Sequence, residues 1–201
     1  MTLSLLDWRR RVHALYADAR AAEDPEAGWA AWRAGRDELF AGHPDSPLGE
    51  AARAAFTGLP VAPYDPQLRF RARLEDAPAQ RLELPTADDG VVALDRIGRV
   101  TLGEVGRLDV WWLGGYGGGV FLPLRDGSAG RGTYGGGRYL LDTVKGADLG
   151  SADGRLVVDL NFAYHPSCTY DPRWSCPLPQ EGNRVDAVVA AGEQLPEGGW
   201  Y

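Results

Sequence analysis

The chain has 201 residues, of which 44% are hydrophobic and 24% are charged, a composition typical of one globular domain. Its formal net charge of -7 argues against a nucleic-acid partner, because neutralising phosphates requires a basic surface. The sequence has no apolar run of the roughly 18 residues that a membrane span needs, so a membrane partner is not expected.

Helical spacing of apolar residues characterises the first third of the chain. Residues 4–21 are predicted to form an amphipathic helix. Asp24-Pro25 resembles an N-cap followed by proline at the first helical position, and it predicts a second helix ending near Ala41. Ser46-Pro47 predicts the start of a third helix by the same reasoning, with Gly58 placed to end it.

The beginning of the chain has no continuous apolar core of signal-peptide length, and its apolar residues are spaced for a helix instead. Secretion is therefore not expected. A cytoplasmic protein with two reduced cysteines is the localisation that this pattern favours.

Short β-prone runs follow residue 60, separated by glycine, proline and acidic turns. The predicted strands are 68–74, 80–84, 91–94, 99–102, 107–113, 120–124, 138–141, 155–160 and 184–191. Asp89-Gly90 is a hairpin signal between two of them. Close spacing without intervening helices favours an antiparallel arrangement. The predicted fold class is α+β in a single domain, with a helical N-terminal third (1–59) packed on a mainly antiparallel β-barrel-like or sandwich body (60–201).

Two glycine-rich segments join predicted strands. Residues 114–119 lack the Lys-Ser/Thr pair of a phosphate-binding P-loop and are predicted to be a flexible hairpin tip. Residues 135–137 would let the backbone approach either a ligand or another strand, and the sequence leaves both interpretations open.

Two arginines stand close to the second glycine-rich segment. Arg125 and Arg138 have guanidinium groups that fit the carboxylate or phosphate of a ligand. The alternative, which the sequence favours, is internal pairing with Asp126, Asp142 or Asp159.

The segment that begins at Asp159 is the most unusual part of the chain. Asp159 and Asn161 alternate with apolar residues, so on a strand they would share one face. His165, Cys168 and Cys176 follow, with seven residues between the cysteines. That spacing matches no standard zinc motif, and an obvious fourth ligand is lacking, so these residues are weak candidates for a metal site.

The same three side chains have other interpretations. A Cys168 or Cys176 nucleophile assisted by His165 is one, although the sequence shows no sign of a lowered thiol pKa. A disulfide is another, and the expected compartment argues against it. Small buried thiols that pack a proline-rich loop are the interpretation favoured here.

Three segments resemble an uncharacterised bacterial and archaeal family, the domain of unknown function DUF1684. They are HPDSPL at 43–48, DGSAGRGTYGGGRYL at 126–140 and DLNFAYHPSCTYDPRWSCPLPQEGNR at 159–184. The chain departs from the family pattern at Leu160, where phenylalanine is expected, and at His165, where asparagine is expected. Relatives would therefore manage without that imidazole. The resemblance implies no activity, but it groups one constellation of residues: Arg125, Asp126, Tyr134, Arg138, Tyr139, Asn161, Tyr164, Cys168 and Cys176.

We expect a binding module for a small polar or anionic ligand, in a pocket lined by Arg125, Asp126, Tyr134, Arg138, Tyr139, Asn161 and Tyr164. One alternative is an enzyme, either a thiol- or metal-dependent hydrolase-like protein that uses His165, Cys168 and Cys176, or a flavin-dependent oxidoreductase on a split-barrel-like body. The flavin hypothesis rests on fold analogy alone. Another alternative makes the constellation structural and places the function in a protein partner on the N-terminal helices. The sequence specifies no cofactor and no oligomeric state.

Overall fold

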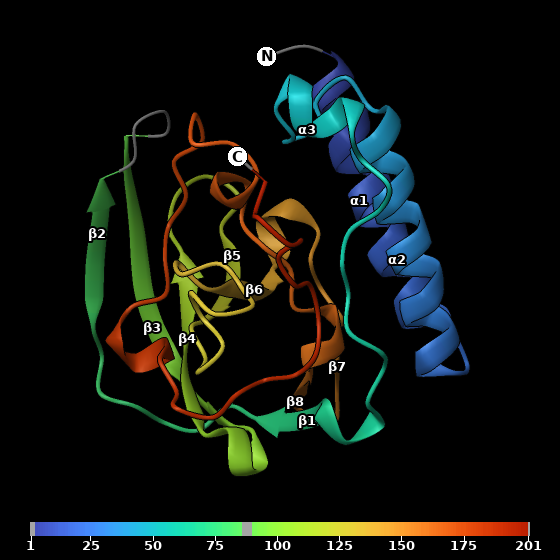
Figure 1. Cartoon of the computed structure of the whole chain (residues 1–201). Helices are drawn as coiled ribbons and strands as arrows, with labels where there is room; N and C mark the ends of the chain where they lie inside the picture. Colours follow the sequence, from blue (N-terminus) through green and yellow to red (C-terminus); the bar gives the residue numbers. More distant parts are fainter. Residues whose placement is uncertain (1–2, 86–89, 201) are drawn as a thin grey trace.

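The computed structural model describes residues 3–85 and 90–200, and it places three helices beside a body of two β-sheets (Figure 1). The helices are α1 (Leu3–Ala21), α2 (Pro25–Gly42) and the short α3 (Glu50–Ala54). The Asp24 carboxylate caps α2 by accepting a hydrogen bond of 3.1 Å from the Glu26 N–H. The first two predicted helices are therefore confirmed.

The third helix begins later than predicted. The Ser46 hydroxyl donates a hydrogen bond of 2.8 Å to the Phe40 carbonyl, so it satisfies a group near the end of α2. The chain enters α3 from Gly49 instead. The start predicted at Ser46-Pro47 is therefore wrong, because that hydroxyl serves the preceding helix.

The body consists of two open antiparallel sheets, with strand orders β2-β3-β4-β5-β6 and β1-β8-β7. Their strands are β1 (Arg69–Arg73), β2 (Arg81–Pro85), β3 (Val91–Thr101), β4 (Arg107–Leu113), β5 (Gly119–Leu124), β6 (Arg138–Asp142), β7 (Ser151–Ala152) and β8 (Arg155–Asp159). The α+β class with a mainly antiparallel body is confirmed. The strands that the structure describes do not close a barrel, so the barrel-like form is replaced by two facing sheets.

The runs predicted as 91–94 and 99–102 are one strand, β3, which is interrupted by a bulge between Arg96 and Gly98. A bulge breaks the alternation of side chains, which is why the sequence pattern reads as two strands. Pro85 of β2 pairs with Val91 of β3 across the hairpin. The predicted turn signal at Asp89-Gly90 lies partly outside the described residues.

Strand β8 ends one residue earlier than predicted, and Leu160–Phe162 form a 3₁₀ turn, η4. The Asp159 carboxylate accepts a hydrogen bond of 3.0 Å from the Asn161 N–H and starts this turn. The predicted placement of Asp159 and Asn161 on one face of a strand is therefore wrong.

The predicted strand 184–191 is also absent from this described part of the chain. Side chains take the place of a neighbouring strand there. The Val189 N–H donates to Asp126 Oδ2 at 2.9 Å, and the carbonyls of Val189 and Ala191 accept from Arg138. The backbone groups are thereby satisfied without a β-ladder.

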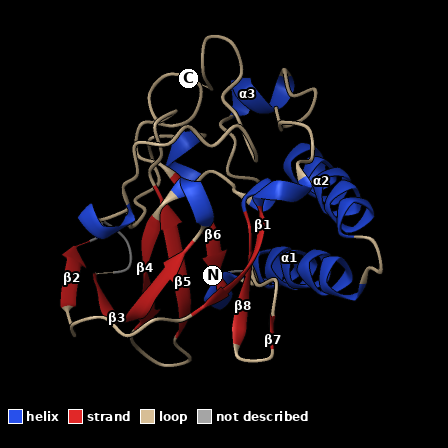
Figure 2. Cartoon of the chain, turned by 90° about the horizontal axis from the view of Figure 1, so that it is seen from below, coloured by secondary structure: helices blue, strands red, loops and turns tan. Residues whose placement is uncertain are grey.

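Two of the buried hydrophobic clusters among the described residues hold these layers together. The larger lies between the sheets and contains Val100, Leu108, Val110, Leu122, Leu124, Leu140 and Val158, among others. The smaller joins α1 and α2 to the three-stranded sheet, and its aromatic members are Tyr16, Trp29, Trp32 and Phe162. Figure 2 shows both helices on the side of the molecule that carries β7 and β8. No described helix is long and apolar enough to cross a membrane.

Candidate functional site

Arg138 is fully buried at the start of β6, and its guanidinium has only internal partners in the described structure. It donates to Asp126 Oδ1 and to the Val189 carbonyl, both at 3.1 Å, and also to the carbonyls of Ala191 and Glu193. Burial acts to raise the pKa of Asp126, but the Arg138 charge and local hydrogen bonds outweigh it and hold that pKa below its ordinary value. The internal pairing favoured from the sequence is confirmed for Arg138 with Asp126.

Asn161 is also completely buried, and its amide group joins two parts of the chain. Its Oδ1 accepts from the Asp65 N–H, while its Nδ2 donates to the Asp65 carbonyl and to Asp159 Oδ1, each at 2.8 Å. The amide therefore fixes the position of the Asp159 carboxylate. As a direct ligand contact, Asn161 stays a prediction.

Arg125 and Tyr139 likewise contact the protein itself. Arg125 Nε donates to the Gly135 carbonyl at 2.9 Å, and the Tyr139 hydroxyl donates to the Pro177 carbonyl at 2.5 Å. The Tyr139 ring lies against Phe121 at a centroid distance of 4.8 Å. These contacts fasten the loops that flank β6, and they do not test whether either residue also binds a ligand.

Tyr164 and Tyr134 connect this network to neighbouring groups. The Arg36 guanidinium lies over the Tyr164 ring at 5.1 Å from its centroid. The Tyr134 N–H donates to His165 Nε2 at 3.2 Å, and the Tyr134 side chain forms a hydrogen bond with Cys168. The structure thus brings some members of the predicted constellation together in pairs, namely Arg138 with Asp126, Tyr139 with Tyr164, and Tyr134 with Cys168. Asn161 and Arg125 instead contact residues outside it.

A buried ion pair between Arg36 and Glu193 is a central feature that the sequence analysis did not single out. Arg36 lies on α2, and its Nε and Nη2 both donate to Glu193 Oε1, the first at 2.8 Å. Oε2 of the same carboxylate accepts from the His165 N–H at 2.8 Å and from the Tyr170 hydroxyl at 2.6 Å. This pair fastens the helical layer to the C-terminal segment.

His165 is a neutral, buried imidazole in this setting. Burial lowers its pKa to about 4, although the nearby Glu193 carboxylate acts in the opposite direction. Its Nε2 accepts the Tyr134 N–H, and its Nδ1 has no hydrogen-bond partner among the described residues. Nε2 is therefore occupied and does not face a thiol as a base.

Cys168 and Cys176 lie in contact, and neither forms a disulfide. Cys176 accepts hydrogen bonds from the Cys168 side chain and from the N–H groups of Cys168 and Ser167, which together lower its pKa to about 6. The same hydrogen bond, with burial, raises the pKa of Cys168. The lowered pKa of Cys176 could not be predicted from the sequence, because the fold brings its donors, the Cys168 thiol and two backbone N–H groups, to the sulfur.

No group of three or more His, Cys, Asp or Glu side chains within residues 3–85 and 90–200 is placed to hold a metal ion. His165 Nε2 already accepts the Tyr134 N–H, and the side chains of the two cysteines form a hydrogen bond with each other. The metal interpretation of these three residues gains no support from their geometry. The flavin interpretation stays a prediction that rests on fold analogy alone.

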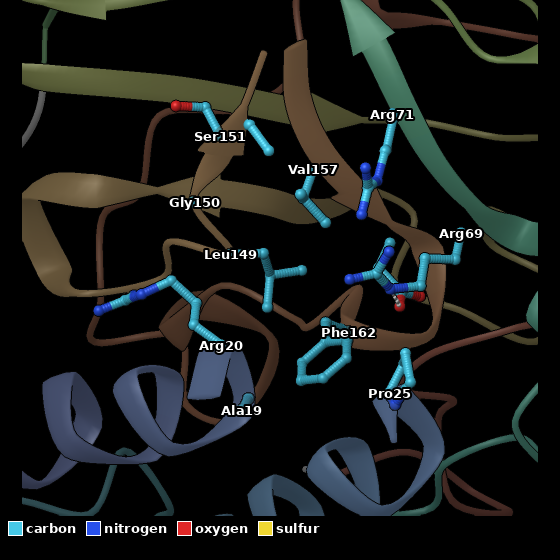
Figure 3. Close-up of a pocket in the computed structure, with 12 residues that line it drawn as sticks. Ala19, Arg20, Pro25, Arg69, Arg71, Leu149, Gly150, Ser151, Val157 and Phe162 are labelled. Atoms are coloured by element: carbon cyan, nitrogen blue, oxygen red, sulfur yellow. Dashed lines mark ion pairs between the residues drawn. The ribbon is translucent and has the colours of Figure 1, made fainter. Parts of the chain in front are cut away.

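A pocket of about 260 Å³ lies between the helices and the three-stranded sheet (Figure 3). We call it the basic pocket. It is lined by Ala19, Arg20, Pro25, Arg69, Arg71, Leu149, Gly150, Ser151, Ala152, Val157, Asp159 and Phe162. In Figure 3, Arg69 and Arg71 extend from β1 over one side of the pocket, and Arg20 extends from α1 on the other side.

The three arginines differ in how their charges are compensated. Arg69 Nε lies 3.4 Å from Asp159 Oδ2. Arg20 Nη1 donates to the Asp148 carbonyl and lies 4.0 Å from the carboxylate oxygen Oδ2 of the same residue. Arg71 has no ion-pair or hydrogen-bond partner in the part of the chain that the structure describes. Burial raises the pKa of Asp159 despite the hydrogen bonds from Asn161.

The basic pocket was not predicted from the sequence, where the candidate residues lie in loops and in the C-terminal motif. A signal was nevertheless present. Arg69, Arg71 and Arg73 alternate along β1, and alternating residues of a strand project on the same side of the sheet. Only the fold shows that Arg20 approaches two of them.

Comparison with known proteins places these features in a family. Residues 54–194 match the family described as "Protein of unknown function (DUF1684)". The solution NMR structure of an uncharacterised protein from gene locus rrnAC0354 of Haloarcula marismortui is similar, with a TM-score of 0.61 and 31% sequence identity. The match covers 88% of this chain and 97% of that one. No curated protein matches the chain. The chain therefore belongs to the DUF1684 family, as the C-terminal motif predicts.

Proposed function

We propose that this protein is a binding module for a small anionic molecule and that the molecule binds in the basic pocket. The observation that carries the proposal is the pair Arg69 and Arg71, which line one pocket from the same strand while Arg20 lines it from α1. Arginine presents a planar fork of donors that matches a carboxylate or a phosphate.

The local charge supports an anion over a neutral or cationic molecule. The pocket lining contains three arginines and one aspartate, whereas the chain as a whole has a net charge of -7. Arg71 is exposed on β1 and has no carboxylate partner among the described residues. An exposed cationic cluster on an acidic protein focuses the local field on anions.

The remaining lining sets the size and character of the molecule. Leu149, Val157 and Phe162 supply an apolar wall, and the backbone of Gly150 adjoins it. A volume of about 260 Å³ is at the small end for ligand sites. These properties favour a small carboxylate or phosphate ester with a short apolar portion.

One residue of the predicted constellation supports this pocket indirectly. Asn161 holds Asp159, and Asp159 forms the ion pair with Arg69 on the pocket wall. The other predicted contacts, which are Arg125, Asp126, Tyr134, Arg138, Tyr139 and Tyr164, stay predictions. An anion in the basic pocket would not require them to change their internal partners.

Isothermal titration calorimetry with inorganic phosphate and with succinate tests the proposal at low and constant ionic strength. Arg71→Gln is the test variant. Arg73→Gln is its matched control, because Arg73 is an exposed arginine on the same side of the same strand but does not line the pocket. A hydrogen bond to a charged group contributes about 1.5–3 kcal/mol, so Arg71→Gln should weaken binding at least about ten-fold.

The control should weaken binding clearly less than Arg71→Gln does, because Arg73 does not line the pocket and would make no direct hydrogen bond to a molecule bound there. Equal weakening in both variants would indicate general electrostatic attraction and contradict a defined site. If neither phosphate nor succinate gave measurable heat of binding to the wild type, the proposal itself would be contradicted.

A further inference from the structure

The segment from Ser167 to Pro177 folds back on itself and brings its two thiols together. A turn at Asp171 reverses the chain: its Oδ1 accepts the Arg173 N–H at 2.9 Å, and its carbonyl accepts the Trp174 N–H at 3.2 Å. This segment, residues 167–177, is called the thiol loop below. It lies outside the lining of the basic pocket.

The second half of the thiol loop is anchored to other parts of the fold. Trp174 Nε1 donates to the Pro47 carbonyl at 3.2 Å, and the Tyr139 hydroxyl donates to the Pro177 carbonyl next to Cys176. These contacts come from the segment before α3 and from β6. The position of Cys176 is therefore set by the fold and not by the loop alone.

The donors around Cys176 favour its thiolate. Its sulfur accepts the Cys168 side chain and the N–H groups of Ser167 and Cys168. A sulfur that accepts several hydrogen bonds is stabilised in its ionised form, which is the nucleophile in thiol chemistry. The cationic Lys145 adds to this effect from η3 (Thr143–Lys145).

Exposure distinguishes the two thiols. Cys176 is half-buried and Cys168 is buried at 9% exposure. A small molecule in solvent therefore has readier access to Cys176 than to Cys168. The other titratable groups that face the pair are Tyr134 and Tyr139, and burial raises the pKa of Tyr139. They supply no carboxylate that would oppose a thiolate.

We propose that the thiol loop is a dithiol exchange site, in which Cys176 attacks and Cys168 resolves. The reactant is a low-molecular-weight disulfide. The Cys176 thiolate attacks one sulfur of that disulfide, the old S–S bond breaks, and one thiol leaves after taking up a proton. Cys168 then loses its proton and attacks Cys176, so the second small thiol leaves. The protein ends with a Cys168–Cys176 disulfide, and two electrons have passed to the small disulfide.

The geometry supports the second step as well as the first. A hydrogen bond between the two side chains already places the sulfurs side by side, and a disulfide requires them to approach to about 2.0 Å. The segment between them is a loop whose backbone hydrogen bonds are local turns. Its longer-range hydrogen bonds run from the Tyr170 hydroxyl to Glu193 and from Trp174 Nε1 to the Pro47 carbonyl, and neither partner lies in a strand. Closure therefore needs only a shift of the thiol loop and no break in either sheet.

The first test is the pH dependence of iodoacetamide alkylation in the native protein, followed by peptide mass spectrometry. Alkylation of Cys176 should reach half its maximal rate near pH 6, with Cys168 protected. Cys168→Ser keeps a hydroxyl donor and should keep that midpoint, whereas Cys168→Ala removes the donor and should raise it by at least about one pH unit. A midpoint near the ordinary thiol value of about 8.5 in the wild type would overturn the inference.

The second test uses oxidised glutathione and intact-protein mass spectrometry. The wild type should release both halves of the reagent and lose two hydrogen atoms, and Cys168→Ser should stop at a mixed disulfide on Cys176. Cys176→Ser should stay unmodified in its native state. A wild type that accumulates the mixed disulfide, or a Cys176→Ser variant that reacts equally fast, would overturn the assignment. If a variant fails to fold, the inference is tested on the wild type alone, by the pH midpoint of Cys176 alkylation and by the mass of the product formed with oxidised glutathione.

Discussion

Replacement of Arg138 by glutamine tests whether this residue serves the fold or a ligand. In the structure its side chain is completely buried and donates to Asp126 and to three backbone carbonyls. Glutamine is shorter, carries no charge and has two donors, so the Asp126 carboxylate would lose its cation. Breaking a buried ion pair by removing one partner costs about 3–5 kcal/mol. For a chain of 201 residues this corresponds to a fall in Tm of roughly 6–20 °C.

The assay is urea denaturation followed by tryptophan fluorescence, with differential scanning calorimetry as a second measurement. Arg131→Gln is the matched control, because Arg131 lies in the same loop region and donates to the Gly127 carbonyl from an exposed position. That variant should change the free energy of unfolding by about 0.5 kcal/mol or less. A loss below about 1 kcal/mol for Arg138→Gln would refute the structural role assigned to the buried pair.

Three further changes follow from other contacts. His165→Asn should reduce the loss of unfolding free energy that acid causes in the wild type. The imidazole of the unfolded chain binds a proton below about pH 6.5 and that of the folded protein only near pH 4, so the wild type loses up to about 3 kcal/mol of stability as the pH falls from 6.5 to 4. Urea titrations at several pH values would measure this loss. A wild-type curve that runs parallel to the variant's would contradict the neutral, buried imidazole. Glu193→Gln should lower the free energy of unfolding by about 3–5 kcal/mol because it leaves Arg36 buried without its carboxylate. The matched control is Asp95→Asn, which breaks the exposed ion pair between Asp95 and Arg81 and should cost at most about 1 kcal/mol. Comparable losses in these two variants, measured by the same titration, would argue against the importance of the buried pair. Asp24→Ala removes the cap of α2 and should cost about 1 kcal/mol by thermal unfolding, and an unchanged Tm would show that the cap contributes nothing.

Local signals in the sequence were enough for most of the secondary structure. Asp24-Pro25 carries both the capping carboxylate and the proline of a helix start, so α2 was predicted correctly. Strand β4 runs over the predicted residues, Arg107–Leu113, because its β-prone residues are bounded by clear turn signals. In each case the residues that decide the structure are neighbours in the chain.

Elements decided by distant contacts were predicted less well. Residues 184–191 have the composition of a strand, but Asp126 and Arg138 satisfy the backbone of Val189 and so replace the neighbouring strand. Ser46 bonds backward to Phe40 and not forward into a helix. The identity of a hydrogen-bond partner far along the chain is not visible in local residue patterns.

The candidate sites show the same division. The C-terminal motif pointed to the two cysteines of the thiol loop, but the lowered pKa of Cys176 depends on the Cys168 thiol and on N–H groups of the 3₁₀ turn Ser167–Thr169, which only the fold brings to it. The basic pocket depends on the approach of Arg20 in α1 to Arg69 and Arg71 in β1. In the sequence, α2 and α3 lie between Arg20 and these two residues. Nothing in either local pattern indicates that encounter.

A titration of the isotopically labelled protein with inorganic phosphate, followed by two-dimensional amide NMR, would show whether an anion binds in the basic pocket. Saturable shifts should cluster at Arg20, at Gly150 and Ser151, and along β1 around Arg71, and these shifts should be lost in Arg71→Gln but kept in Arg73→Gln. Shifts that grow linearly, scatter over unrelated surface residues or are unchanged in Arg71→Gln would show that the basic pocket is not an anion site.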